Sequence, residues 1–186
     1  QVGRRDFEFR FRVHDEAGEP VQGASIHLVA GEESAPLGHL PARITDARGE
    51  LRWKKFAYGA WWVDISSPGY APVRTCPYQF RSTDAPDRQY AVQLRAGRKL
   101  VVAVLGEDGR SVAGAEVEFA YQNLNLPTYS RWVVQTDTAG KVSITVPQSV
   151  DAVISASSEG SEAEEVSAGD ANSLTLRLRA VGHDRP

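Results

Sequence analysis

Residues 45–49 read TDARG and residues 136–140 read TDTAG, so the chain contains nearly the same short stretch twice. In such a stretch the aspartate side chain can accept hydrogen bonds from the backbone N–H groups that follow it, and the glycine can take the positive φ that closes the turn. We therefore predict two matching structural turns, made by the following residues: Asp46 with Gly49, and Asp137 with Gly140. The alternative, that the two aspartates bind calcium, is disfavoured because neither has other carboxylates at ligand spacing.

The sequence around the two turns is duplicated as well. Positions 13–69 align with positions 104–160 without a gap. Identities fall mainly at turn residues, and hydrophobic character is kept where identity is not, as in Trp53 against Ile144. Self-similarity of this kind indicates two copies of one structural unit.

The closing segments of the two copies mark the domain boundary. YAVQLRA at 90–96 matches LTLRLRA at 174–180, and the second copy is shorter just before it. We predict a first domain at 1–96 and a second at 97–186, with almost no linker. Two cores so close together are expected to share an interface.

Hydrophobic periodicity predicts strands throughout the chain. DFEFRFRV at 6–13 alternates apolar and polar side chains, as a half-buried strand does. Further short segments rich in Val, Ile and aromatic residues are separated by turns that contain Gly, Pro and Asp, which is typical of an antiparallel sandwich. Only SEGSEAEEVSA at 158–168 has the propensity for a short turn of helix. The sequence thus predicts an all-β protein.

Composition narrows the possible functions. The 186 residues carry a formal net charge of −3, which leaves no basic excess for nucleic acid, and no apolar run is long enough to span a membrane. A chain that starts at Gln1 and contains no Met is expected to be either a mature, processed protein or a piece of a longer one. The only cysteine, Cys76, lies beside Pro77 and far from any evident base, so we interpret it as an ordinary small side chain.

The repeated pattern resembles a known family. VHDEAGEPVQGASIHLV at 13–29, TDARGELRW at 45–53 and YGAWWVDISSPGYAPV at 58–73 are similar to the carboxypeptidase regulatory-like domain, and 104–119 with 136–146 repeat the first two parts. The resemblance implies two tandem Ig-like/transthyretin-like antiparallel β-sandwiches, each of about seven strands. It also implies an accessory, non-catalytic module of exported proteins, and therefore a periplasmic or extracellular location.

The sequence offers no catalytic or metal-binding set. No serine lies in a GxSxG motif, no Ser, His and Asp set can be assembled by spacing, and no two histidines have HxH or HxxxH spacing. We expect the strand that holds His27 to lie near Arg10 or Arg12, whose charge would disfavour a bound cation. No catalytic residue, metal or cofactor is therefore predicted, although an enzyme assembled at the seam between the domains stays open.

Exposed aromatic residues are the candidate binding site. In AWWVDI the alternation places Trp61 on the core face and Trp62 on the outer face, and exposed tryptophans often mark contact surfaces. Trp62 could stack on a sugar, form a protein contact, or lie under the loop that follows. The other candidates are the tyrosines Tyr58, Tyr70, Tyr78 and Tyr129, the last of which lies in a predicted polar, aromatic loop at 121–132.

Besides an enzyme at the domain seam, these observations favour two functions from different classes. The first is a non-catalytic module of an exported protein that acts as a spacer or protein-interaction segment, with another protein or further domains of a longer chain as its partner. The alternative is a carbohydrate-binding accessory module that uses the aromatic residues around Trp62.

Overall fold

The computed structural model describes residues 8–30, 41–54, 59–75, 78–80, 89–123, 129–163 and 165–180. These residues form strands and turns, so the protein is all-β as predicted, and none of them belongs to a helix that could cross a membrane. The chain divides into two compact units, residues 1–96 with 123–129, and residues 97–122 with 130–186. Each unit is a β-sandwich and is described by itself.

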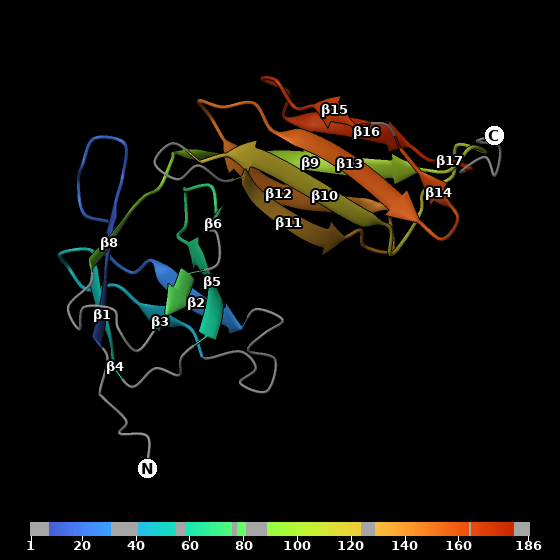
Figure 1. Ribbon diagram of the computed structural model, residues 1–186. Helices are drawn as coiled ribbons and strands as arrows, with labels where there is room; N and C mark the ends of the chain where they lie inside the picture. Colours follow the sequence, from blue (N-terminus) through green and yellow to red (C-terminus); the bar gives the residue numbers. More distant parts are fainter. Residues whose placement is uncertain are drawn as a thin grey trace, which may run out of the picture. The chain divides into compact units, whose positions relative to one another are not determined.

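The first unit consists of two sheets (Figure 1). One has the strand order β4 (Glu50–Lys54), β1 (Glu8–His14), β8 (Gln89–Gln93). The other has the order β3 (Arg43–Ile44), β2 (Ser25–Ala30), β5 (Gly59–Ser66), β6 (Val73–Arg74), and β7 (Tyr78–Phe80) also pairs with β5.

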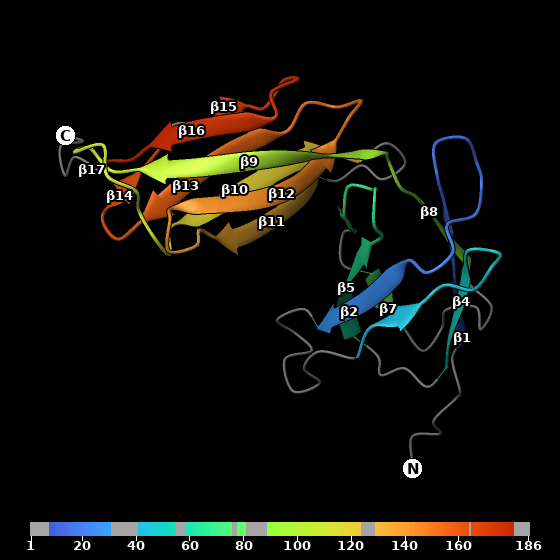
Figure 2. The ribbon, with the colours of Figure 1, turned by 180° about the vertical axis from the view of Figure 1, so that it is seen from behind.

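The second unit repeats this plan, and its first four strands are longer than those of the first unit (Figure 2). Its smaller sheet has the order β12 (Lys141–Pro147), β9 (Gly97–Leu105), β16 (Ser173–Arg177). Its larger sheet has the order β11 (Tyr129–Gln135), β10 (Glu116–Gln122), β13 (Val153–Ser158), β14 (Ser161–Glu162), β17 (Arg179–Ala180), and β15 (Val166–Ser167) pairs with β13.

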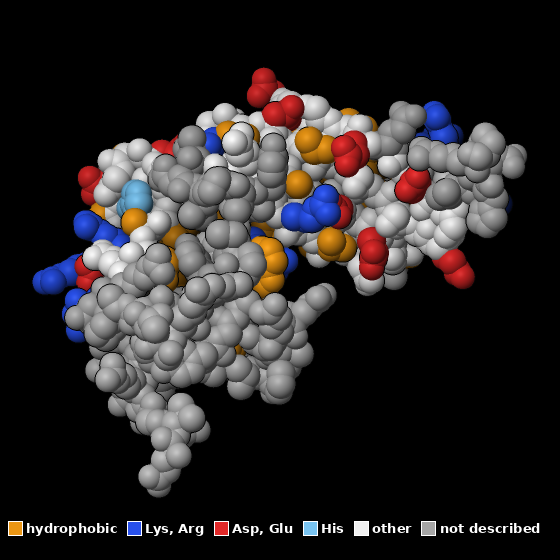
Figure 3. All heavy atoms as spheres, in the orientation of Figure 1, with side chains coloured by type: hydrophobic (Ala, Val, Ile, Leu, Met, Phe, Trp, Pro, Cys, Tyr) orange, Lys and Arg blue, Asp and Glu red, His pale blue; other side chains and the backbone are white. Residues whose placement is uncertain are grey.

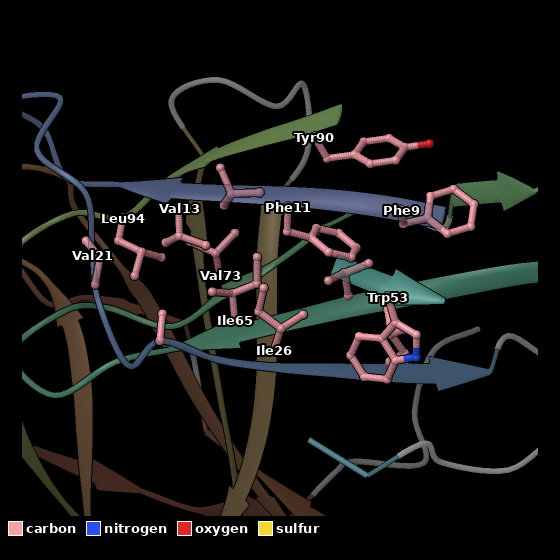
Figure 4. Packing of buried hydrophobic residues seen from close by; sticks show 14 of the residues in the cluster. Phe9, Phe11, Val13, Val21, Ile26, Trp53, Ile65, Val73, Tyr90 and Leu94 are labelled. Atoms are coloured by element: carbon pink, nitrogen blue, oxygen red, sulfur yellow. The ribbon is translucent and has the colours of Figure 1, made fainter. Parts of the chain in front are cut away.

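The core of the first unit lies between its two sheets (Figure 4). Alternation along β1 turns Phe9, Phe11 and Val13 inward, and each is at most 2% exposed. Alternate residues of β2 and β5 meet them from the other sheet, among them Ile26 and Trp61. Close packing of these apolar side chains is the main favourable contribution to folding of the unit.

The second unit is built on the same alternation. Leu100, Val102 and Val104 of β9 are fully buried, and the larger sheet buries alternate residues of β10 and β13, including Val117 and Ile154. Apolar side chains at every second position of both sheets therefore specify which face of each strand points inward.

One feature of the pairing departs from the predicted antiparallel order. β1 is antiparallel to β4 but parallel to β8, and β9 is antiparallel to β12 but parallel to β16. The first and last long strands of each unit can lie side by side in parallel because the chain between them passes through the other sheet. Parallel neighbours always need such a crossover.

Three local expectations were wrong. Residues 121–122 and 129–132 of the predicted loop 121–132 belong to β10 and β11, and the described part of 158–168 forms short strands and a turn rather than helix. His27 lies opposite Asp64, not beside Arg10 or Arg12, because β2 and β1 belong to different sheets. The first two errors concern which segments form strands, and the third concerns strand partners, which depend on segments distant in the sequence.

Candidate functional site

The TDARG stretch forms the turn that leads into β4. The Asp46 carboxylate oxygen Oδ1 accepts hydrogen bonds from the backbone N–H groups of Arg48 and Glu50, both at 2.9 Å. Gly49 has a φ of 70°, and its N–H donates to the Asp46 carbonyl at 2.9 Å. One side chain thus satisfies two donors that the turn would otherwise leave to solvent.

The TDTAG stretch repeats these contacts before β12. The Asp137 oxygen Oδ1 accepts from the N–H groups of Ala139 and Lys141 at 2.9 Å each, and Gly140 has a φ of 69°. Within the described ranges, no group of three or more His, Cys, Asp or Glu residues could hold a metal ion.

The threonines of the two turns have a role that sequence reasoning missed. Thr45 is 3% exposed, and its hydroxyl accepts from the Ala24 N–H at 2.9 Å and donates to the Val21 carbonyl at 2.7 Å. Thr136 makes the equivalent bonds to Ala115 and Val112. Each hydroxyl therefore joins its turn to the segment that precedes β2 or β10.

We predict that Thr45→Val and Thr136→Val each lower the free energy of unfolding by about 1–3 kcal/mol. Valine keeps the shape of threonine but leaves a buried N–H and a buried carbonyl without their hydroxyl partner. Urea denaturation measures the loss, and Thr175→Val, at an exposed position of β16, is the matched control. A loss no larger than that of the control would contradict the structural role of the hydroxyls.

We also expect Asp46 to make the stability of the fold depend on pH. The pKa of its carboxyl group lies below the ordinary value because the N–H of Glu50, and then that of Arg48, donates to the ionised form. A pKa that is lower in the folded than in the unfolded state stabilises the fold above the ordinary value, and this contribution is lost as the pH falls through the folded-state pKa.

Asp46→Asn should therefore flatten the loss of stability below about pH 4 while keeping an oxygen acceptor in the turn. Urea unfolding of the variant and the wild type between about pH 5 and pH 2 measures the two slopes. Equal slopes would show that Asp46 does not contribute to acid unfolding.

A second repeated contact lies where each unit ends. The Glu16 side chain accepts from the Ala96 N–H at 3.2 Å, and its counterpart Glu107 accepts from the Ala180 N–H at 2.9 Å. Both glutamates lie in the turn after the first strand of their unit, and both alanines follow the last long strand. The alignment of Glu16 with Glu107 in the repeat was the only sequence signal for this contact.

Trp62 lies on the outer face of β5, between its buried neighbours. It is 37% exposed, whereas Trp61 is 1% exposed, and Val29 of β2 lies opposite it in the sheet. Further along β5, Asp64 accepts two hydrogen bonds from the guanidinium of Arg74, at 2.7 and 2.6 Å. The Asp64 carboxylate raises the pKa of Arg74 above its ordinary value. The indole face could stack on the ring of a ligand, and the charged side chains of the pair could form hydrogen bonds with that ligand.

The predicted tyrosines do not all join Trp62. Tyr70 packs partly buried against the core of the first unit, and its N–H donates to the Ser67 carbonyl. Tyr58 lies outside the described residues, and Tyr78 and Tyr129 lie in β7 and β11, with side chains outside the described part. Of the five aromatic candidates, Trp62 is therefore the one whose side chain is described and lies on an outer sheet face.

Sequence reasoning also missed a shallow groove on the outer face of the larger sheet of the second unit. It has a volume of about 270 Å³ and is lined by the following residues: Glu116, Glu118, Val133, Ser155, Ala156, Ser157, Glu162, Ala163 and Glu165. Glu118 forms an ion pair with Arg131 at 2.7 Å. On the face drawn in Figure 3, hydrophobic side chains of this unit lie singly among polar and charged ones, which is ordinary for a protein surface.

No protein family model matches the chain, and no curated protein matches it. Solved structures similar to it include a streptococcal ancillary pilin, with 12% identity, a TM-score of 0.42 and coverage of 96% of this chain and 64% of that one. The shaft pilin SpaA from Lactobacillus rhamnosus GG has 9% identity, a TM-score of 0.38 and coverage of 97% and 100%. The Bacillus anthracis TIE protein has 13% identity, a TM-score of 0.40 and coverage of 94% and 34%. At this level the likenesses carry no argument about function.

Proposed function

We propose that the chain is a non-catalytic tandem module of an exported protein, in which two rigid sandwich domains, 1–96 and 97–186, act as a spacer. The observation that supports the proposal is that the two units share the same strand plan and the same turn contacts. Each has a buried core, and each joins its turns to its strands by the same buried threonine contacts and the same exposed aspartate and glutamate contacts. Units so constructed keep their shape while holding neighbouring parts apart.

The exported location and the relation to carboxypeptidase regulatory-like domains belong to the same proposal. They rest on the sequence pattern at 13–29, 45–53 and 58–73. A periplasmic or extracellular module of this kind would have further domains or another protein as its partner.

The spacer role is tested by the distance between the two units in solution. Spin labels at Ala17 and Glu159, exposed turn residues of the first and second unit, are placed on cysteines in a Cys76→Ser background. Pulsed electron resonance should give a narrow distance distribution. A broad distribution would overturn the spacer role and favour two units that work as separate binding surfaces.

Carbohydrate binding is the second candidate, because Trp62 exposes its indole beside the Asp64 and Arg74 pair. A glycan array followed by fluorescence titration should then identify a sugar whose binding is lost in Trp62→Ala. Ile44→Ala, which removes another exposed apolar side chain of the same unit, is the control. A glycan that binds Trp62→Ala as tightly as the wild type would rule out stacking on Trp62, as would the absence of any bound glycan.

A further inference from the structure

We propose that each unit resists tension along the chain through a shear clamp, which consists of its first and last long strands. In the first unit the clamp is β1 with β8, and in the second it is β9 with β16. The inference rests on the proposed spacer function, and it names the mechanical property that a spacer under tension would need.

The clamp follows from the direction of the strands. β1 and β8 are parallel over five residue pairs, from Arg10 opposite Gln89 to His14 opposite Gln93. β9 and β16 are parallel over five pairs, from Val101 opposite Ser173 to Leu105 opposite Arg177. Tension enters each unit at the start of its first strand and leaves at the end of its last long strand. In a parallel pair, these two points lie at opposite ends of the pair.

Tension therefore slides the two strands past each other. The evenly spaced hydrogen bonds of a parallel ladder are then strained together, and several must break before the strands separate. Had the pair been antiparallel, both points would lie at the same end, and the bonds would open one after another.

Two further hydrogen bonds lie at the end of each clamp. The Leu94 N–H donates to the His14 carbonyl at 2.8 Å, and the Leu178 N–H donates to the Leu105 carbonyl at 2.8 Å. One step further along, the Glu16 and Glu107 carboxylates hold the N–H groups of the closing alanines. These contacts lie where tension leaves each unit.

Further contacts stabilise the start of the second clamp and the core-facing side of the first clamp. The Arg98 guanidinium donates to the carbonyls of Gly169 and Ala171, just before β16 begins. In the first clamp the Tyr90 ring of β8 stacks on the Phe11 ring of β1, with ring centroids 5.8 Å apart. Sliding would pull these rings apart, which adds the cost of exposing apolar surface to that of breaking hydrogen bonds.

The two clamps are also connected in series. β8 ends at Gln93 and β9 begins at Gly97, and Leu94 between them is fully buried. Tension that leaves the first clamp thus passes into the second through a very short segment.

Single-molecule pulling of the full chain in two geometries tests the proposal. Handles at the two termini load both clamps in shear, whereas handles at Ala17 and Ala96 pull β1 and β8 apart from the same end. At one pulling speed, we expect the first unit to unfold at a several-fold higher force in the first geometry, because forced unfolding depends on the barrier that is loaded. Equal forces would overturn the clamp, since the protein and its equilibrium stability are the same in both measurements.

A matched pair of variants tests the clamp end. Glu107→Ala should lower the terminal-pulling force of one unfolding event, and Glu159→Ala, at an exposed turn of the same unit, should leave both events unchanged. Unchanged forces in Glu107→Ala would exclude the glutamate from the clamp. The spin-label distances are a separate readout, so equal forces with a narrow distribution would refute the clamp alone, and a broad distribution with unequal forces would refute the spacer alone.

Discussion

The Gly49→Ala variant is expected to lose about 2–5 kcal/mol of free energy of unfolding, from a single added methyl group. At the φ of 70° an L side chain is strained, and the new Cβ would lie 2.3 Å from the Val13 carbonyl oxygen. That oxygen is fixed, because it accepts from the Val21 N–H, while the Val13 N–H donates to the Gly49 carbonyl. The backbone therefore cannot move away without breaking hydrogen bonds that join β1 to the turn.

The Gly23→Ala variant distinguishes the effect of the Cβ contact from the effect of the strained backbone conformation. Gly23 has nearly the same φ, 73°, but a Cβ added there would meet no atom within 4 Å, so only the conformational cost of about 1–2 kcal/mol is expected. Urea denaturation of both variants gives the comparison. Equal losses would mean that the close approach to Val13 does not matter.

Trp61→Ala is expected to cost about 3–5 kcal/mol, the largest loss for a side-chain truncation in the first unit. Trp61 is the largest of the fully buried side chains, and its removal leaves a cavity among rigid strands that cannot close over it. Thermal or urea unfolding followed by circular dichroism measures the effect. If the variant does not fold, Trp61→Phe, which keeps an aromatic ring, should fold with a smaller loss.

Trp62→Ala is the control for Trp61→Ala, because it removes the same side chain from the next position of the same strand. Trp62 is 37% exposed and faces outward, so its truncation should cost much less than that of Trp61. Similar losses would show that the two faces of β5 are not distinguished as the structure describes.

The all-β class and most strands could be predicted from the sequence because they depend on local pattern. Phe9, Phe11 and Val13 alternate with polar residues, and the structure buries all three. The parallel pairs and β11 could not be predicted in this way. Strand partners depend on contacts between distant segments, and β11 begins within a polar segment whose composition is typical of a loop.

The candidate site was predictable to a similar extent. Asp46 and Gly49 were identified because turn formation depends on a few neighbouring residues. Thr45 and Glu16 were missed because their partners lie far away in the sequence, at Val21 and Ala96. Trp62 was placed on the outer face by its alternation with Trp61, whereas whatever binds there depends on surroundings that alternation does not report.

The repeated turn contacts also indicate which positions the two halves keep and which they vary. Core positions tolerate any apolar side chain of suitable volume, so Trp53 in one half can correspond to Ile144 in the other. The turn threonine, aspartate and glycine each supply a contact or a backbone angle that few other residues offer. Other units of this design should therefore be recognisable by these few polar and glycine positions even where their interiors share no residues.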